Sequence, residues 1–218
     1  DLQEFEQPLK VLRLYKEGEP FLNTNLPEMI AYAKSSDRVP YIDTTTNGYL
    51  LTPKNVDAVI GAGIDRINIS LDGLSDEMFW DITQTKVDFK KFVEQVKYLY
   101  ANKGNCEICI KMVGDNLTED ERIFFFDTFG DLCDRIYLEN LAPCWPEFDA
   151  EKRMGWEIKT GIYGQKIEHV DTCPYIFYGM SVNSDGTVSV CFLDWARKLV
   201  IGDVRKQSVK EIWDSDTM

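Results

Sequence analysis

The residues with the clearest capacity for chemistry are two cysteines in the C-terminal fifth of the chain, Cys173 and Cys191. An Asp-Gly pair at 185–186 lies between them, flanked by the apolar, β-favouring runs 180–182 and 188–192. Asp-Gly supplies the positive φ of a primed turn, so the segment predicts a β-hairpin that returns Cys191 toward Cys173. Two such thiols could form a disulfide, half of a metal site, or a packed pair in the core.

The other cysteines are expected to be buried. Cys106 and Cys109 form a CxxC, but they lie in a β-rich run, 106–113. Residues three apart in a strand point to opposite faces, so the pattern favours strand packing over a shared metal. Cys133 and Cys144 flank a predicted strand and are interpreted as buried thiols.

Composition excludes several classes of protein. The chain has 218 residues, a net charge of −13 and 44% hydrophobic residues. Nucleic-acid binding needs clusters of Lys and Arg, and a membrane span needs about 20 apolar residues, so neither partner is expected. The single histidine, His169, argues against a His-rich zinc site and against a Ser-His-Asp triad. We expect a cytoplasmic protein.

The elements that must position these residues alternate between strand and helix as far as residue 142. The predicted strands are Lys10–Leu14, Val39–Asp43, Arg66–Leu71, Glu107–Val113 and Arg135–Leu141. Helix signals fall between them: Asn25 with Pro27, Thr52 with Pro53, the apolar spacing of 89–100, and a capping box of Thr118 and Glu121. A second capping box, Ser208 with Glu211, predicts a last helix over 209–214.

Repeated βα units predict an α/β fold with parallel strands and right-handed crossovers. Five units are too few for a closed eight-stranded barrel, which leaves an open, partial barrel or a Rossmann-like sheet. In both, ligands bind at the carboxyl ends of the strands. Residues 1–142 are therefore expected to form this α/β domain, 143–172 an irregular linker, and 173–218 a hairpin with a helix.

Polar motifs follow the predicted strands in order. They are Gly18-Glu19-Pro20, Thr46-Asn47-Gly48, Ser70-Leu71-Asp72-Gly73, and the region of Lys111, Gly114 and Asn116. Each motif alone is typical of a turn. Together they would surround one end of the sheet with a carboxylate, amides and a hydroxyl, which suits a polar zwitterion that carries a ribose.

In this order the motifs resemble those of radical S-adenosylmethionine (radical SAM) enzymes with a C-terminal SPASM domain. Gly18-Glu19-Pro20 is similar to the end of the GGEP motif, although Glu17 replaces its first glycine. The second and third motifs resemble TNG and SLDG. Cys173-x12-Gly186-x4-Cys191 resembles the opening half of the SPASM cysteine pattern, and 202–213 resembles the segment after it.

The resemblance implies S-adenosylmethionine and [4Fe–4S] clusters as cofactors, a reductant protein, and a peptide or small-molecule substrate. It assigns cofactor binding to Gly18, Glu19, Pro20, Asn47, Ser70 and Asp72. Glu19 would bind the methionine amino group, and Ser70 would approach the ribose. Cys173 and Cys191 would be metal ligands, and the SPASM-like segment would be 173–218.

Two features depart from the family. Its CxxxCxxC loop should precede Gly18, but no cysteine precedes Cys106, and the remaining SPASM cysteines should follow Trp213. Since a radical SAM cluster needs three thiolates, we expect this chain to be inactive and to hold no cluster. We interpret it as a fragment of an oxidoreductase; the alternative is a degenerate homologue that lost its cluster.

Other functions stay open from the residues alone. A non-catalytic α/β binding protein would share the fold. An aldolase-like barrel would use Lys111 as a Schiff-base lysine, but this leaves the cysteine hairpin unexplained. A zinc hairpin at Cys173 and Cys191 would need two further ligands.

Overall fold

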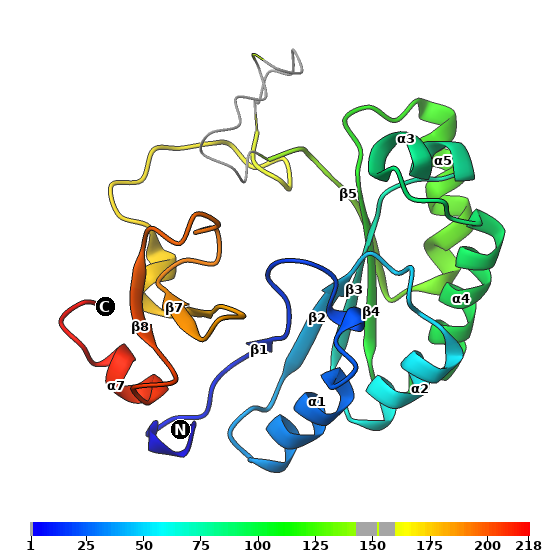
Figure 1. Ribbon diagram of the computed structural model, residues 1–218. Helices are drawn as coiled ribbons and strands as arrows, with labels where there is room; N and C mark the ends of the chain where they lie inside the picture. Colours follow the sequence, from blue (N-terminus) through cyan, green and yellow to red (C-terminus); the bar gives the residue numbers. More distant parts are fainter. Residues whose placement is uncertain (1, 143–151, 153–159) are drawn as a thin grey trace. The chain divides into compact units, whose positions relative to one another are not determined.

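The computed structural model describes residues 2–142, 152 and 160–218, which fall into two compact units (Figure 1). The larger unit comprises 9–141 and 162–164. The smaller comprises the described residues of 1–8, 142–161 and 165–218. Cys144 and residues 143–151 and 153–159 of the expected linker lie outside the described residues. The domain boundaries expected from the sequence stay predictions.

A five-stranded parallel sheet forms the centre of the larger unit, with its strands in sequential order. The strands are β1 (Leu12–Arg13), β2 (Ile42–Thr46), β3 (Arg66–Leu71), β4 (Glu107–Val113) and β5 (Arg135–Glu139). Because right-handed crossovers that never change direction place every helix on the same face, the other face is left open. This is the partial barrel, not the Rossmann-like alternative, whose strand order reverses.

The helices follow the expected order and lie on one side of the sheet (Figure 1). They are α1 (Leu26–Ser35), α2 (Pro53–Gly61), α3 (Asp76–Thr83), α4 (Phe89–Asn102) and α5 (Glu119–Phe129). The capping box of Thr118 and Glu121 is confirmed. Helix α3 was not predicted; Ser75 caps it by accepting a hydrogen bond from the Met78 amide at 3.1 Å.

The core lies between the helices and the sheet face that they cover. The buried strand residues are Ile67, Ile69 and Leu71 of β3, and Ile108, Ile110 and Met112 of β4. The helices contribute aromatic rings: Phe92 of α4 and Phe129 of α5 meet edge-on with centroids 6.4 Å apart. Alternate residues of β3 and β4 therefore point to the core or to the open face.

Strand boundaries differ from those expected at three places. The second strand, expected over Val39–Asp43, runs instead from Ile42 to Thr46. Pro40 has no amide to donate, while the β-branched Thr44–Thr46 continue the ladder. The first strand shortens to two residues at the sheet edge, and the fifth ends at Glu139 rather than Leu141.

The smaller unit contains a three-stranded antiparallel sheet of β6 (Ser181–Val182), β7 (Thr187–Ser189) and β8 (Val200–Asp203), followed by α7 (Val209–Trp213). The Ser208 and Glu211 capping box is confirmed. The Ser208 hydroxyl also donates to Glu4 at 2.8 Å, which joins the N-terminal segment to α7. Short 3₁₀ helices occur in this unit at Leu2–Glu4 and Pro174–Phe177. The larger unit has two more, at Pro20–Leu22 and Gly130–Leu132.

The β6–β7 hairpin is confirmed, but its turn is not the primed type. Only Gly186 has a positive φ, 86°, and its amide donates to the Asn183 carbonyl at 2.9 Å. Asp185 keeps a negative φ and accepts from the Thr187 amide at 3.0 Å. A three-residue loop, 184–186, that ends in a left-handed glycine therefore replaces the expected two-residue loop.

Cys106, Cys109 and Cys133 are buried, as expected. Burial raises the pKa of Cys106 to about 12 and that of Cys133 to about 11, and it also raises the pKa of Cys109. In the described part of the chain, no helix has the length and apolar character needed to cross a membrane.

Gly48 tests how closely the larger unit is packed. Its φ is 82°, and a Cβ there would lie 2.8 Å from the Phe92 ring. We predict that Gly48→Ala lowers the free energy of unfolding by about 2–4 kcal/mol, measured by urea denaturation. In the control, Gly61→Ala, a Cβ meets nothing within 4 Å at the end of α2. Equal stability of the two variants would contradict this packing.

Candidate functional site

Glu19 joins the loop after β1 to the end of β2. It precedes the 3₁₀ helix Pro20–Leu22, and its Oε1 accepts from the Phe21 amide at 2.9 Å and from the Thr46 hydroxyl at 2.7 Å. Its Oε2 accepts from the Asn47 amide at 2.8 Å. A carboxylate offers about four acceptor positions, so one position on Oε2 stays available to a ligand.

The turn after β2 is held by its own side chains. The Thr46 hydroxyl accepts from the Gly48 amide at 3.0 Å, and Asn47 Oδ1 accepts from the Tyr49 amide at 3.1 Å. Asn47 is thus fixed next to Glu19, and Tyr49 is directed back toward β3.

Asp72 follows β3. Together with Glu19 and Asn47 it forms a polar rim at the carboxyl ends of the first three strands, called the rim below. Its Oδ2 accepts a hydrogen bond from the Tyr49 hydroxyl at 2.8 Å. Burial and the nearby Glu19 charge raise the pKa of Asp72, while the Tyr49 hydroxyl opposes the rise. Hydrogen bonds through Asn47 and Tyr49 connect Asp72 to Glu19.

Ser70 lies two residues before Asp72, next to the last residue of β3. Its register partner on β4 is Lys111, and both project to the open face, because Ile69 and Leu71 fill the core. In the described part of the chain the Ser70 hydroxyl has no hydrogen-bond partner. It is therefore available to a ligand.

The structure thus brings Gly18, Glu19, Pro20, Asn47 and Asp72 to one rim, with Ser70 beside it. Tyr49 was not singled out from the sequence, and Thr46 was named only as part of its motif, without a role for its hydroxyl. Both flank the Asn47-Gly48 turn, but only the pairing of β1, β2 and β3 reveals their partners.

Charged residues cross the open face near the amino ends of the strands. Each strand contributes one, in the order Arg13, Asp43, Arg66, Glu107 and Arg135, and neighbours are 2.6–3.8 Å apart. Asp43, on β2 between Arg13 and Arg66, is fully buried. We call this row the charge ladder. Its alternating charges nearly cancel, so this part of the open face has a small net charge.

Nearer the carboxyl ends, Lys111 pairs with Glu139 of β5. Lys111 Nζ lies 3.0 and 2.9 Å from the two carboxylate oxygens. This pairing engages the Lys111 amine with a carboxylate, whereas a Schiff-base lysine needs its amine free to attack a carbonyl. The geometry gives no support to the aldolase-like alternative.

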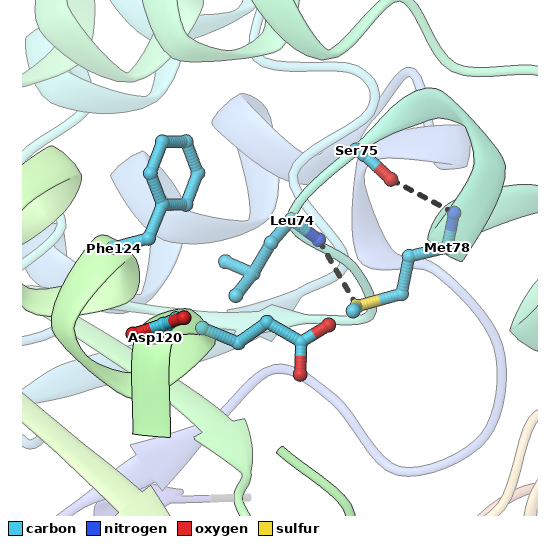
Figure 2. Close-up of a pocket in the computed structure, with 6 residues that line it drawn as sticks. Leu74, Ser75, Met78, Asp120 and Phe124 are labelled. Carbon is cyan, nitrogen blue, oxygen red and sulfur yellow. Dashed lines mark hydrogen bonds between the residues drawn. The ribbon is translucent and has the colours of Figure 1, made fainter. Parts of the chain in front are cut away.

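A groove of about 360 Å³ lies at the same end of the sheet, on the helix side (Figure 2). It runs between the start of α3 and the start of α5, and its lining is Leu74, Ser75, Met78, Asp120, Glu121 and Phe124. None of the residues predicted to bind a cofactor lines it. Glu121 is also occupied by the capping box of α5.

Cys173 and Cys191 belong to the smaller unit. Cys173 is exposed and Cys191 is half-buried, and both are free thiols. Tyr175 and Phe192, close neighbours of the two cysteines in sequence, meet edge-on with ring centroids 5.5 Å apart. The two segments therefore lie side by side, and the thiols are accessible in the same region.

The described residues do not fit a catalytic [4Fe–4S] cluster. Within them, no group of three or more His, Cys, Asp or Glu side chains is arranged to hold a metal. The three cysteines of the larger unit are buried, and a pair of thiols in the smaller unit is fewer than a cluster needs. We therefore derive no step through a cluster at these residues.

Comparison with known proteins supplies two family matches. The profile described as "Radical SAM superfamily" matches residues 4–129, more than half of the chain. The SPASM profile, described as "Iron-sulfur cluster-binding domain", matches residues 173–218.

Among curated proteins, a GTP 3′,8-cyclase of Staphylococcus haemolyticus is 28% identical over 168 residues, 72% of this chain and 47% of the cyclase. The chain thus spans about half the length of that relative. Two solved structures share the fold. Streptococcus suis SuiB bound to precursor peptide SuiA has a TM-score of 0.63 at 13% identity, covering 94% of this chain and 54% of SuiB. AnSMEcpe with bound AdoMet and a peptide has a TM-score of 0.63 at 15% identity, and the match covers 99% of this chain and 69% of anSMEcpe.

The charge ladder gives a prediction for Asp43. Asp43→Ala leaves Arg66 without its closest carboxylate in a half-buried position, so we predict a loss of about 3 kcal/mol in the free energy of unfolding. The control is Glu94→Ala, which removes an exposed pair with Lys97 and should cost less than about 0.5 kcal/mol. A small loss for both variants in urea denaturation would show that the ladder contributes little.

The cysteines give a second prediction. In the folded protein, maleimide should label Cys173 fastest and Cys191 next, because accessible thiols ionise and react more readily than buried ones. Cys106, Cys109 and Cys133 should be labelled only after denaturation. Peptide mass spectrometry resolves each site. Slow labelling of both Cys173 and Cys191 in the folded protein would show that these thiols are packed in the core.

Proposed function

This chain belongs to the radical SAM superfamily, and we propose that its larger unit binds S-adenosylmethionine at the rim formed by Glu19, Asn47 and Asp72. The parent activity that we propose is that of a radical SAM oxidoreductase with a SPASM domain. It would cleave S-adenosylmethionine reductively and abstract hydrogen from a peptide or small-molecule substrate.

The observation that carries the proposal is the state of Glu19. Three donors from the chain fix its carboxylate in place, and one acceptor position on Oε2 is left over. An ammonium group fits that position, because a charge-assisted hydrogen bond to a fixed carboxylate is among the strongest available. We assign this role to Glu19 and the methionine amino group.

The other rim residues have complementary tasks in this proposal. Asp72 adds a second carboxylate, which favours a ligand that carries positive charge on both ammonium and sulfonium groups. The free Ser70 hydroxyl is suited to the ribose. Gly18, Pro20 and Asn47 hold the backbone that presents Glu19, with Pro20 opening the 3₁₀ helix that Glu19 caps.

When bound there, S-adenosylmethionine would supply hydrogen-abstracting chemistry: one electron would break its S–C5′ bond, with methionine as the leaving group. In the superfamily that electron comes from a [4Fe–4S] cluster, which the described residues do not accommodate. The inactivity of this chain by itself stays a prediction, as do metal binding by Cys173 and Cys191, a reductant protein as partner and a cytoplasmic location.

The charges of the open face favour a substrate of low net charge. Its four cations, Arg13, Arg66, Arg135 and Lys111, are each within ion-pair distance of a carboxylate of the same face. A triphosphate requires several uncommitted cations, and the described sheet face presents none. We therefore favour a peptide over a nucleotide such as the GTP named for the cyclase relatives.

The test is the affinity for S-adenosylmethionine, measured by isothermal titration calorimetry. We predict that Glu19→Ala weakens binding by about 1.5–3 kcal/mol, the contribution of a hydrogen bond to a charged group. Glu17→Ala is the matched control, since it removes the same charge two residues away, where Glu17 faces Lys16 at 3.8 Å.

Circular dichroism must show both variants folded. Equal affinity of the Glu19 and Glu17 variants for S-adenosylmethionine would show that Glu19 does not bind it. No measurable binding by the unaltered chain would favour the alternative, a degenerate homologue or non-catalytic α/β binding protein.

A further inference from the structure

Tyr49 occupies a fixed position directly behind the rim. Its ring meets Phe79 edge-on at 5.5 Å and Phe92 edge-on at 6.4 Å between centroids. Its amide is held by Asn47 Oδ1 at 3.1 Å. Packing on two sides and a backbone hydrogen bond leave the ring little freedom, so its hydroxyl is a rigid donor.

That donor is directed at one acceptor. The Tyr49 hydroxyl lies 2.8 Å from Asp72 Oδ2. Among the described residues, the titratable groups that act on Asp72 are Tyr49 and Glu19, and no cationic side chain does. Asp72 therefore depends on a single hydroxyl to offset both burial and a neighbouring negative charge.

We propose that Tyr49 is a positioning residue of the cofactor site: its hydroxyl holds the Asp72 carboxylate in place at the rim, so that the rim favours a positively charged ligand. This inference rests on the proposed binding of S-adenosylmethionine. It adds a residue that no motif of the sequence marks and gives its mode of action.

The electrostatics agree with the geometry in sign. Burial and Glu19 raise the pKa of Asp72, and the Tyr49 hydroxyl lowers it, because a donor stabilises the charged form. Burial also raises the pKa of Tyr49 to about 12, so that the hydroxyl keeps its proton and acts as a donor throughout the neutral range. Removing the hydroxyl must therefore raise the pKa of Asp72 further.

The chain offers a matched control in Tyr98. Its hydroxyl also donates to an aspartate, Asp57, at 3.0 and 3.1 Å, but on the exposed helical side of the larger unit. Tyr98→Phe removes the same chemical contact without touching the rim. Phenylalanine keeps the ring at both positions, so the packing around Tyr49 is retained.

The first measurement needs no ligand. The pKa of the Asp72 carboxyl is read by NMR titration of ¹³C-labelled aspartate, with Asp72→Asn to assign the signal. We expect Tyr49→Phe to raise it by about one pH unit, the equivalent of one modest charge-assisted hydrogen bond, and Tyr98→Phe to leave it unchanged. An unchanged value in Tyr49→Phe would overturn the inference.

The second measurement is the affinity for S-adenosylmethionine between pH 5 and pH 8. Binding should weaken as pH falls and Asp72 takes up a proton. In Tyr49→Phe this loss should begin at higher pH by about the same shift, so that the affinity becomes up to about tenfold weaker than in the unaltered chain once the pH falls below both Asp72 pKa values. A purely structural role of Tyr49 would lower the melting temperature without moving the pH profile.

A double substitution separates the possible failures. In an Asp72→Asn background, adding Tyr49→Phe should no longer move the pH profile, because the titrating group is gone. If the unaltered chain binds and Tyr49→Phe shows the same profile, the inference fails and the proposed function stands. If the unaltered chain does not bind, the proposed function fails together with the role of Tyr49 in it.

Discussion

The five strands of the larger sheet are parallel and neighbours in chain order, so the strand order never reverses. All connecting helices consequently cover one face, and the residues of the other face cannot rely on a helix layer for burial. This constraint explains the alternation along β3, where Ile67, Ile69 and Leu71 are buried while Arg66, Asn68 and Ser70 are not. It also explains the charge ladder, because a half-covered polar face is stable only when its charges are paired.

The elements that the sequence predicted well are those whose signals are local. Strands β3 and β4 have the expected bounds, since alternating apolar residues set both their face and their length. The capping boxes at Thr118 and Ser208 fix helix starts through contacts three residues apart. Helix α3 was missed because its eight residues form barely two turns, and its Ser75 cap has no Glu or Gln at the third helical position to complete a capping box.

The site could be predicted only in part, for a similar reason. The motifs around Glu19, Asn47 and Asp72 can be found in the sequence. Because each follows a predicted parallel strand, they are expected together at the carboxyl ends of the sheet, where ligands bind. What joins them depends on register. Thr46 reaches Glu19 across 27 residues, and Tyr49 reaches Asp72 across 23. Such pairings follow from which strands are neighbours, and no periodicity in one segment contains that information.

The two rim carboxylates differ in how the fold supports them. Glu19 has three donors and is committed to joining β1 to β2, so its position is part of the fold itself. Asp72 has one, and no cation among the described residues balances its charge. A positively charged ligand at this rim would therefore favour ionised Asp72, and ionised Asp72 would favour the ligand by the same factor, since coupling free energies are reciprocal. Below the raised pKa of Asp72, binding must displace a proton. The rim is consequently a site whose affinity is set as much by the support behind Asp72 as by the groups that touch the ligand.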